Sequence, residues 1–150
     1  MMTNNEERLS AEFENALKLR DAGDLYAARK AFESLVEQLL PADITLLAHS
    51  HMQLGNICDQ LGDQSSREAH FRAAVEVAPE RQLASLGLFH TLYEQGRIDE
   101  ALQEMLRLLH LRDSDMYREL LCDGYGSRFS TEQQRLVVDA RRLLKKHRQN

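Results

Sequence analysis

Two kinds of side chain stand close enough in this sequence to suggest chemistry, histidine and cysteine. His49 and His51 form a His-x-His pair, and Cys58 follows His51 by seven residues. On a helix, residues two apart point about 200° away from each other, because each residue turns the chain by about 100°. The two histidines are therefore not expected to share a metal ion, and we interpret His51 and Cys58 as residues that pack between helices.

The other candidates for catalysis or ion binding give no complete motif. Cys122 lies near a predicted helix end with no base beside it, which favours a plain thiol. Asp113, Asp115, Glu119 and Asp123 are close together but lack the spacing of a calcium-binding loop. No zinc-ligand spacing, phosphate-binding glycine loop or nucleophile-elbow motif is present. The sequence predicts no catalytic residue, no metal site and no cofactor, and we expect the chain not to be an enzyme.

Composition and charge narrow the class further. The 150 residues are 43% hydrophobic and 29% charged, which suits one globular domain. Residues 1–134 hold 13 Lys/Arg and 23 Asp/Glu, net −10, whereas residues 135–150 hold six Lys/Arg and one Asp, net +5. An acidic body disfavours nucleic acid. The polar start and the lack of a run of about 20 apolar residues predict a cytoplasmic protein without membrane contact.

Three glycine turns divide most of the sequence into repeated units. A large apolar side chain lies nine residues after each glycine, in the pairs Gly23–Phe32, Gly62–Phe71 and Gly96–Met105. Glycine suits a helix C-terminus that needs positive φ, and Pro41 and Pro79 close the first two units because proline resists continuing a helix. The pattern predicts an all-α chain with helices at about 5–22, 24–40, 43–61, 64–78, 80–95, 98–111, 114–123 and 131–148.

The second unit resembles the tetratricopeptide repeat (TPR) family. Its matching residues are His51-x2-Leu54-Gly55-x2-Cys58, followed by Gly62, Phe71, Ala74 and Pro79. In this pattern the small Gly55 lets two helices approach closely, and Phe71 fills the space beyond. The resemblance implies one domain built as a helix-turn-helix repeat solenoid. Its hairpins are expected at about 9–41, 43–79 and 80–113, with a C-terminal capping region at 114–150.

Two residues depart from the family pattern. Arg67 stands where the family has a small residue, and Phe89 stands where the second unit has Gly55. Both are expected to loosen or re-angle the packing locally.

In this family the first helix of each hairpin lines a concave groove that takes a peptide or helix of another protein. The resemblance therefore implies a non-catalytic adaptor or scaffold with a protein partner. The implied partner-binding residues are Phe13, Glu14, Leu17, His49, Met52, Gln53, Asn56, Asp59, Leu86, His90, Tyr93 and Glu94. The alternative is that Phe13, Leu17 and Leu86 only pack against neighbouring helices. The cations with which some members clamp a C-terminal carboxylate are missing here, so that subtype is not expected.

The identity of the partner stays open at this point. The short acidic chain with three repeats and terminal helices resembles bacterial type III secretion chaperones, and a toxin-neutralising immunity protein is an alternative of the same kind. A small regulatory or enzymatic domain that uses the thiol of Cys58 or Cys122 is the rival from another class. Homo-oligomer formation is a further open alternative.

The last predicted helix, at 131–148, is amphipathic. Ser130 and Gln133 form a capping box at its start. One side carries Leu136, Ala140, Leu143 and Leu144, with Val137 at its edge, and the other carries Arg135, Arg142, Lys145 and Lys146. We interpret the apolar side as a cap on the last hairpin and the basic side as a solvated face. Docking of an acidic protein and binding of nucleic acid are the alternatives for the basic side.

Overall fold

A computed structural model describes residues 1–149, and this range contains eight α-helices and no strand. The helices are α1 (Asn4–Asp21), α2 (Leu25–Gln38), α3 (Ile44–Gln60), α4 (Gln64–Val77), α5 (Gln82–Glu94), α6 (Ile98–Leu111), α7 (Asp115–Leu120) and α8 (Thr131–Gln149). The predicted all-α fold of helical hairpins is confirmed. The contacts divide the chain into two compact units, residues 1–78 and 79–150, so the single domain remains a prediction.

The predicted glycine turns separate the two helices of each hairpin. Gly23, Gly62 and Gly96 have φ values of 84°, 80° and 78°, a region that residues with a Cβ rarely adopt. After the first two turns an aspartate caps the next helix. Asp24 accepts a hydrogen bond from the backbone N–H of residue 27 at 3.3 Å, and Asp63 accepts one from that of residue 66 at 3.2 Å. Each turn therefore ends one helix and starts the next within a few residues.

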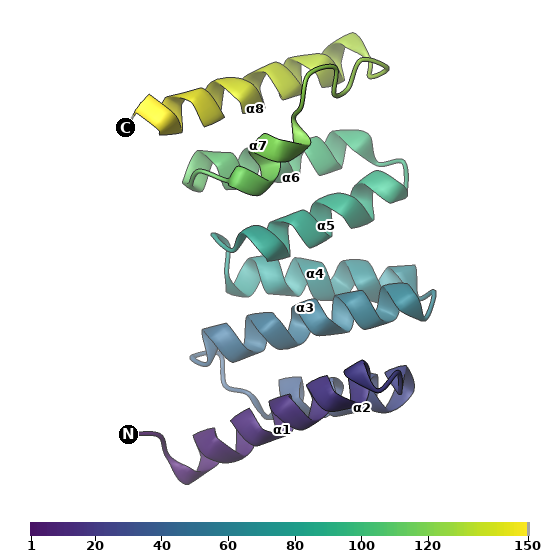
Figure 1. Cartoon of the computed structure of the whole chain (residues 1–150), viewed down its shortest axis with the longest axis vertical. Helices are drawn as coiled ribbons and strands as arrows, with labels where there is room; N and C mark the ends of the chain where they lie inside the picture. The colour runs from purple at the N-terminus through teal and green to yellow at the C-terminus, as the bar shows by residue number, and fades with distance from the viewer. Residues whose placement is uncertain (150) are drawn as a thin grey trace. The chain divides into compact units, whose positions relative to one another are not determined.

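The first unit consists of the hairpins α1–α2 and α3–α4 (Figure 1). Its core includes Phe32, Leu35, Leu54 and Ile57, which are all fully buried. The predicted close approach is present, because a Cβ added at Gly55 would lie only 2.6 Å from the ring of Phe71. Only glycine, which has no Cβ, fits at this position. The close packing of α3 on α4 therefore depends on Gly55.

The second unit contains the hairpin α5–α6, the short α7 and the long α8, which packs on α6 (Figure 1). The capping box at the start of α8 is confirmed, since Ser130 and Gln133 exchange two hydrogen bonds of 3.1 Å. The residues of α8 that face the core are Val137, Ala140 and Leu144. Leu136 and Leu143, predicted near the centre of the stripe, are only half-buried. The stripe is thus centred about one residue from its predicted position.

Both departures from the family pattern are accommodated by polar or aromatic neighbours. Arg67 is buried, and its guanidinium lies 3.1 Å from Asp59 and donates to Gln64 at 3.1 Å. Phe89 is also buried, with its ring edge-to-face against Tyr117 at a centroid distance of 5.7 Å. Each bulky residue therefore has its own partners instead of an empty or overfilled space.

Candidate functional site

The predicted partner-binding residues fall into both units, eight in the first and four in the second. In the first unit they lie on α1 and α3, which are neighbours. The ring of Phe13 lies 6.3 Å from that of His49, measured between centroids. Arg20 of α1 also donates a hydrogen bond to the side chain of Gln53. We call this surface the α1–α3 face.

Members of the α1–α3 face differ in how much surface they offer. Glu14 and Asn56 are exposed, and the half-buried side chains are Phe13, Leu17, His49 and Gln53. Met52 is only 8% exposed, so it contributes little to any contact. Asp59 is exposed but already holds an ion pair with Arg67 at 3.1 Å. The face thus combines an apolar strip with exposed polar ends.

The remaining predicted residues, Leu86, His90, Tyr93 and Glu94, lie on α5 in the second unit. Tyr93 stacks on Phe89 at 5.7 Å between ring centroids and meets Phe129 of the loop before α8 at 6.1 Å. Leu86 and His90 are half-buried. Much of the tyrosine surface is therefore used inside the second unit.

A pair of histidines in contact was not predicted from the sequence. Nδ1 of His51 on α3 lies 3.2 Å from Nδ1 of His70 on α4, so one ring must donate and the other accept. Burial lowers the pKa of His51 to about 4, with a smaller contribution from His70. Burial is also the main cause that lowers the pKa of His70, against the opposing effects of Glu33 and Asp63. Both rings are thus held in their neutral forms at neutral pH.

Stability should fall on mild acidification because of this pair. The unfolded chain binds a proton to His51 near pH 6.5, whereas the folded chain binds it near pH 4. The stabilisation is therefore complete above about pH 6.5 and is lost as the pH falls towards 4. We expect His51→Gln to flatten the dependence of the unfolding free energy on pH by about 1–2 kcal/mol between pH 6.5 and 4.5, after allowance for partial exposure. The free energy is measured by urea unfolding at each pH, and the same dependence on pH in His51→Gln as in the unchanged chain would contradict this.

The two thiols have different surroundings. Cys58 is fully buried, and burial raises the pKa of its thiol against the smaller lowering effect of Arg29. A buried thiol with a raised pKa is a poor nucleophile. Cys122 is exposed, and its backbone oxygen accepts a hydrogen bond from Arg141 at 3.0 Å.

A buried polar network in the second unit also escaped prediction. The hydroxyl of Ser85 donates to Glu104 at 2.6 Å and lies 2.8 Å from the hydroxyl of Tyr117, while Arg107 pairs with Glu104 at 2.7 Å. Burial raises the pKa of Tyr117 far above its usual value. Ser85 and Tyr117 are fully buried and Glu104 is 8% exposed, so a substrate has no access. The network instead joins α5, α6 and α7 through satisfied hydrogen bonds.

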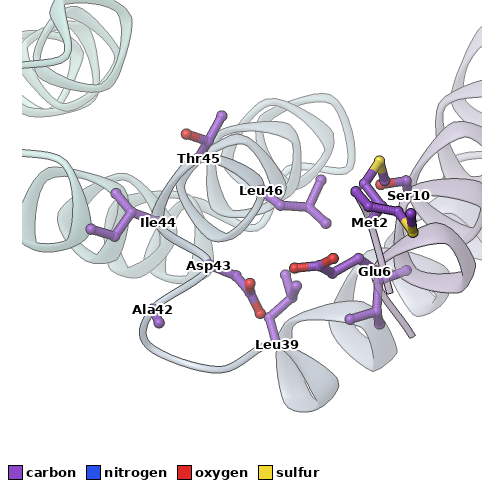
Figure 2. A pocket seen from close by; sticks show the side chains of 11 residues that line it. Met2, Glu6, Ser10, Leu39, Ala42, Asp43, Ile44, Thr45 and Leu46 are labelled. Carbon is purple, nitrogen blue, oxygen red and sulfur yellow. The ribbon is translucent and has the colours of Figure 1, made fainter. Parts of the chain in front are cut away.

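A pocket of about 460 Å³ opens at the start of the first unit, between the N-terminus and the α2–α3 loop. Figure 2 shows the carboxylates of Glu6 and Asp43 among apolar side chains such as Leu39, Leu46 and Met2. Both carboxylates already accept backbone hydrogen bonds, Glu6 at 2.6 Å and Asp43 at 3.1 Å. These bonds stabilise the helix start and the loop. They account for the presence of the two carboxylates in the pocket, and no ligand is needed to explain them.

Among residues 1–149, no three His, Cys, Asp or Glu side chains are arranged to hold a metal ion. Within the same range, none of the helices has the length and apolar character required to cross a bilayer.

Comparison with known families agrees with the hairpin geometry. Residues 48–81 match a family model described as tetratricopeptide repeat. The match includes most of α3, the turn at Gly62 and all of α4, where Gly55 contacts Phe71. No curated protein sequence matches the chain significantly. Residues 48–81 thus form a tetratricopeptide repeat, set among further helical hairpins of the chain.

Proposed function

We propose that the chain is a non-catalytic adaptor that binds a segment of another protein on the α1–α3 face. Repeats of this family serve in general as protein–protein interaction modules. The observation that carries the proposal is the contact between the first helices of two successive hairpins. Phe13 meets His49, and Arg20 bonds Gln53, so side chains of α1 and α3 form one continuous surface.

The chemistry of this face suits a peptide or helix with mixed character. Phe13 and Leu17 provide half-buried apolar surface, on which the apolar side of a partner can pack. Glu14, His49 and Asn56 provide hydrogen-bonding groups that set the partner's register. Leu86, His90, Tyr93 and Glu94 of α5 are proposed as a second contact region, in which the Tyr93 ring already contacts Phe89 and Phe129.

The proposed non-catalytic role also fits the other polar groups of the chain. The buried thiol of Cys58 has a raised pKa, and the Ser85–Glu104–Tyr117 network is closed to solvent. A secretion chaperone and a toxin-neutralising immunity protein are both forms of this binding function. The partner's identity distinguishes them, since the first binds an exported protein and the second binds a toxin.

The test is affinity capture of partners from cells of the source organism, with quantification by mass spectrometry. We expect Glu14→Lys combined with Asn56→Arg to reduce capture of the main partner by about tenfold or more, because both exposed positions flank the apolar strip. The matched control is Glu76→Lys with Ala69→Arg, which makes the same charge change at exposed positions of α4. Equal capture by both variants, with unchanged melting temperatures, would contradict the proposed face.

A further inference from the structure

The side of α8 that faces the segment 118–127 carries two adjacent pockets. A basic pocket of about 240 Å³ is lined by Arg118, Leu121, Arg141, Leu144, Lys145 and Arg148. A smaller pocket of about 130 Å³ is lined by Tyr125, Val137, Val138, Arg141 and the turn around them. Arg141 borders both pockets, and we call the two neighbouring pockets together the α8 groove.

The α8 residues of the groove recur with helical spacing. They occupy positions 134, 137, 138, 141, 144, 145 and 148. Steps of three and four residues keep side chains on one side of a helix, and 14 residues rise by about 21 Å. The groove is therefore long enough for about six residues of an extended peptide, at about 3.3 Å each.

The groove has an excess of positive charge. Arg118 is balanced by ion pairs with Asp113 at 2.6 Å and Asp115 at 2.7 Å. No ion pair joins Lys145 or Arg148 to another residue in the range 1–149. Arg141 donates to the backbone oxygen of residue 122 and has no carboxylate partner within the same range. Three cations thus lie at steps of four and three residues on one side of a helix.

Such an arrangement is unfavourable for α8 alone. Like charges three or four residues apart destabilise a helix, and the helix dipole favours cations only within the last turn, which excludes Arg141. Leu121 and Leu144 form an apolar floor between the cations, and Val138 at the other pocket is 50% exposed. A solvated cap needs neither the apolar floor nor the aligned charges.

We propose that the α8 groove binds an acidic peptide segment of a partner protein. Its carboxylates pair with Arg141, Lys145 and Arg148, and one of its aliphatic side chains enters the pocket beside Val138. Carboxylates form charge-assisted hydrogen bonds with guanidinium and ammonium groups, and the apolar pocket supplies a position for a side chain. A nucleic acid would bring phosphates along its whole length to a chain of net charge −5, which disfavours it as the occupant.

This groove is independent of the α1–α3 face. The two surfaces belong to different units of the chain, and no residue is shared between them. Glu14→Lys with Asn56→Arg should therefore leave binding at the α8 groove unchanged, so either proposal can fail without the other.

The experiment uses the full chain and a fluorescein-labelled octapeptide of sequence Leu-Glu-Asp-Glu-Glu-Leu-Asp-Glu. We expect saturable binding by fluorescence anisotropy, weakening several-fold as salt rises from about 50 to about 300 mM. Amide chemical shifts in NMR spectra should change within residues 118–127 and 134–148. Lys145→Glu with Arg148→Glu should weaken binding by about tenfold or more. Lys18→Glu with Lys30→Glu, an equal charge change on the first unit, should not.

Four results would overturn the proposal. The first is equal binding of the analogue with Gln and Asn in place of Glu and Asp, and the second is chemical-shift changes confined to other helices. The third is no binding at about 1 mM peptide. The fourth is tighter binding of another anion at the same residues, either a 12-nucleotide single-stranded DNA or phosphatidylserine vesicles. Lys145 and Arg148 have no ion pair within residues 1–149, so their variant is expected to keep its melting temperature. Lys145→Gln with Arg148→Gln repeats the test should charge reversal unfold α8.

Discussion

Gly55→Ala is expected to destabilise the first unit by about 1–3 kcal/mol, and Gly55→Leu by more, because both overpack the contact between α3 and α4. A Cβ at this position would lie 2.6 Å from Cε2 of Phe71 and 2.8 Å from two further ring atoms. Phe71 is 3% exposed, so its ring cannot turn aside without disturbing the core. Urea unfolding followed by circular dichroism measures the loss.

A double-mutant cycle separates this contact from general loss of stability. Phe71→Leu removes ring atoms and should cost about 1–3 kcal/mol by itself through lost packing. Combined with Gly55→Ala, it makes room for the new methyl group. The double variant should therefore lose less stability than the sum of the losses of the two single variants. Asn56→Ala, at an exposed neighbouring position of α3, is the control and should change stability by less than about 0.5 kcal/mol. Strict additivity of the two core changes would show that Gly55 does not limit the helix approach.

The same pair of residues explains why the fold could be predicted from the sequence. The spacing from Gly62 to Phe71 reflects a helix that must end at positive φ and a second helix that must fill the gap above Gly55. Both requirements are local, since each restricts which residue types fit within one hairpin. The helix bounds followed from them, as for α6, where prediction and structure agree at Ile98–Leu111.

Side-chain partners across helices could not be predicted in this way. The contact of His51 with His70 joins positions 19 apart, and that of Ser85 with Tyr117 joins positions 32 apart. Both depend on how each helix is rotated about its own axis, and one residue of rotation turns a side chain by about 100°. Arg67 had a local signal that could have been used, because Gln64 lies three residues earlier on the same helix and accepts its hydrogen bond.

The candidate sites show the same limit. The sequence placed Phe13 and His49 on inner helix faces, but only the structure shows their rings 6.3 Å apart. Met52 was assigned to the same face and is 8% exposed. The α8 groove needed the position of the segment 118–127, which has no periodicity of its own. Which side of α8 is buried also depends on α6, and this contact places Val137 in the core in preference to Leu136.

Val137→Asp is expected to destabilise the second unit by about 3–5 kcal/mol, the other large effect in this chain. Val137 is 2% exposed on a helix that packs on α6, so the new carboxylate would be buried in place of an apolar side chain. The adjacent Val138 is 50% exposed and provides a matched control, since Val138→Asp adds the same charge to the same helix. We expect the control to lose less than about 1 kcal/mol. Because Val138 lines the α8 groove, Val138→Asp should nevertheless weaken binding of the acidic octapeptide.

The two valines also test whether α8 is part of the folded unit or a detachable tail. Two side-chain hydrogen bonds hold the ends of α8 on α6. One joins Gln133 to Asp99 at 2.8 Å, and the other joins His147 to the backbone oxygen of Leu109 at 2.6 Å. If α8 is integral, Val137→Asp should lower the melting temperature of the whole second unit and promote association through exposed apolar surface. Analytical ultracentrifugation together with thermal unfolding would detect both effects. Equal melting temperatures for the two variants would show instead that α8 can leave α6 without cost, which would remove one wall of the α8 groove.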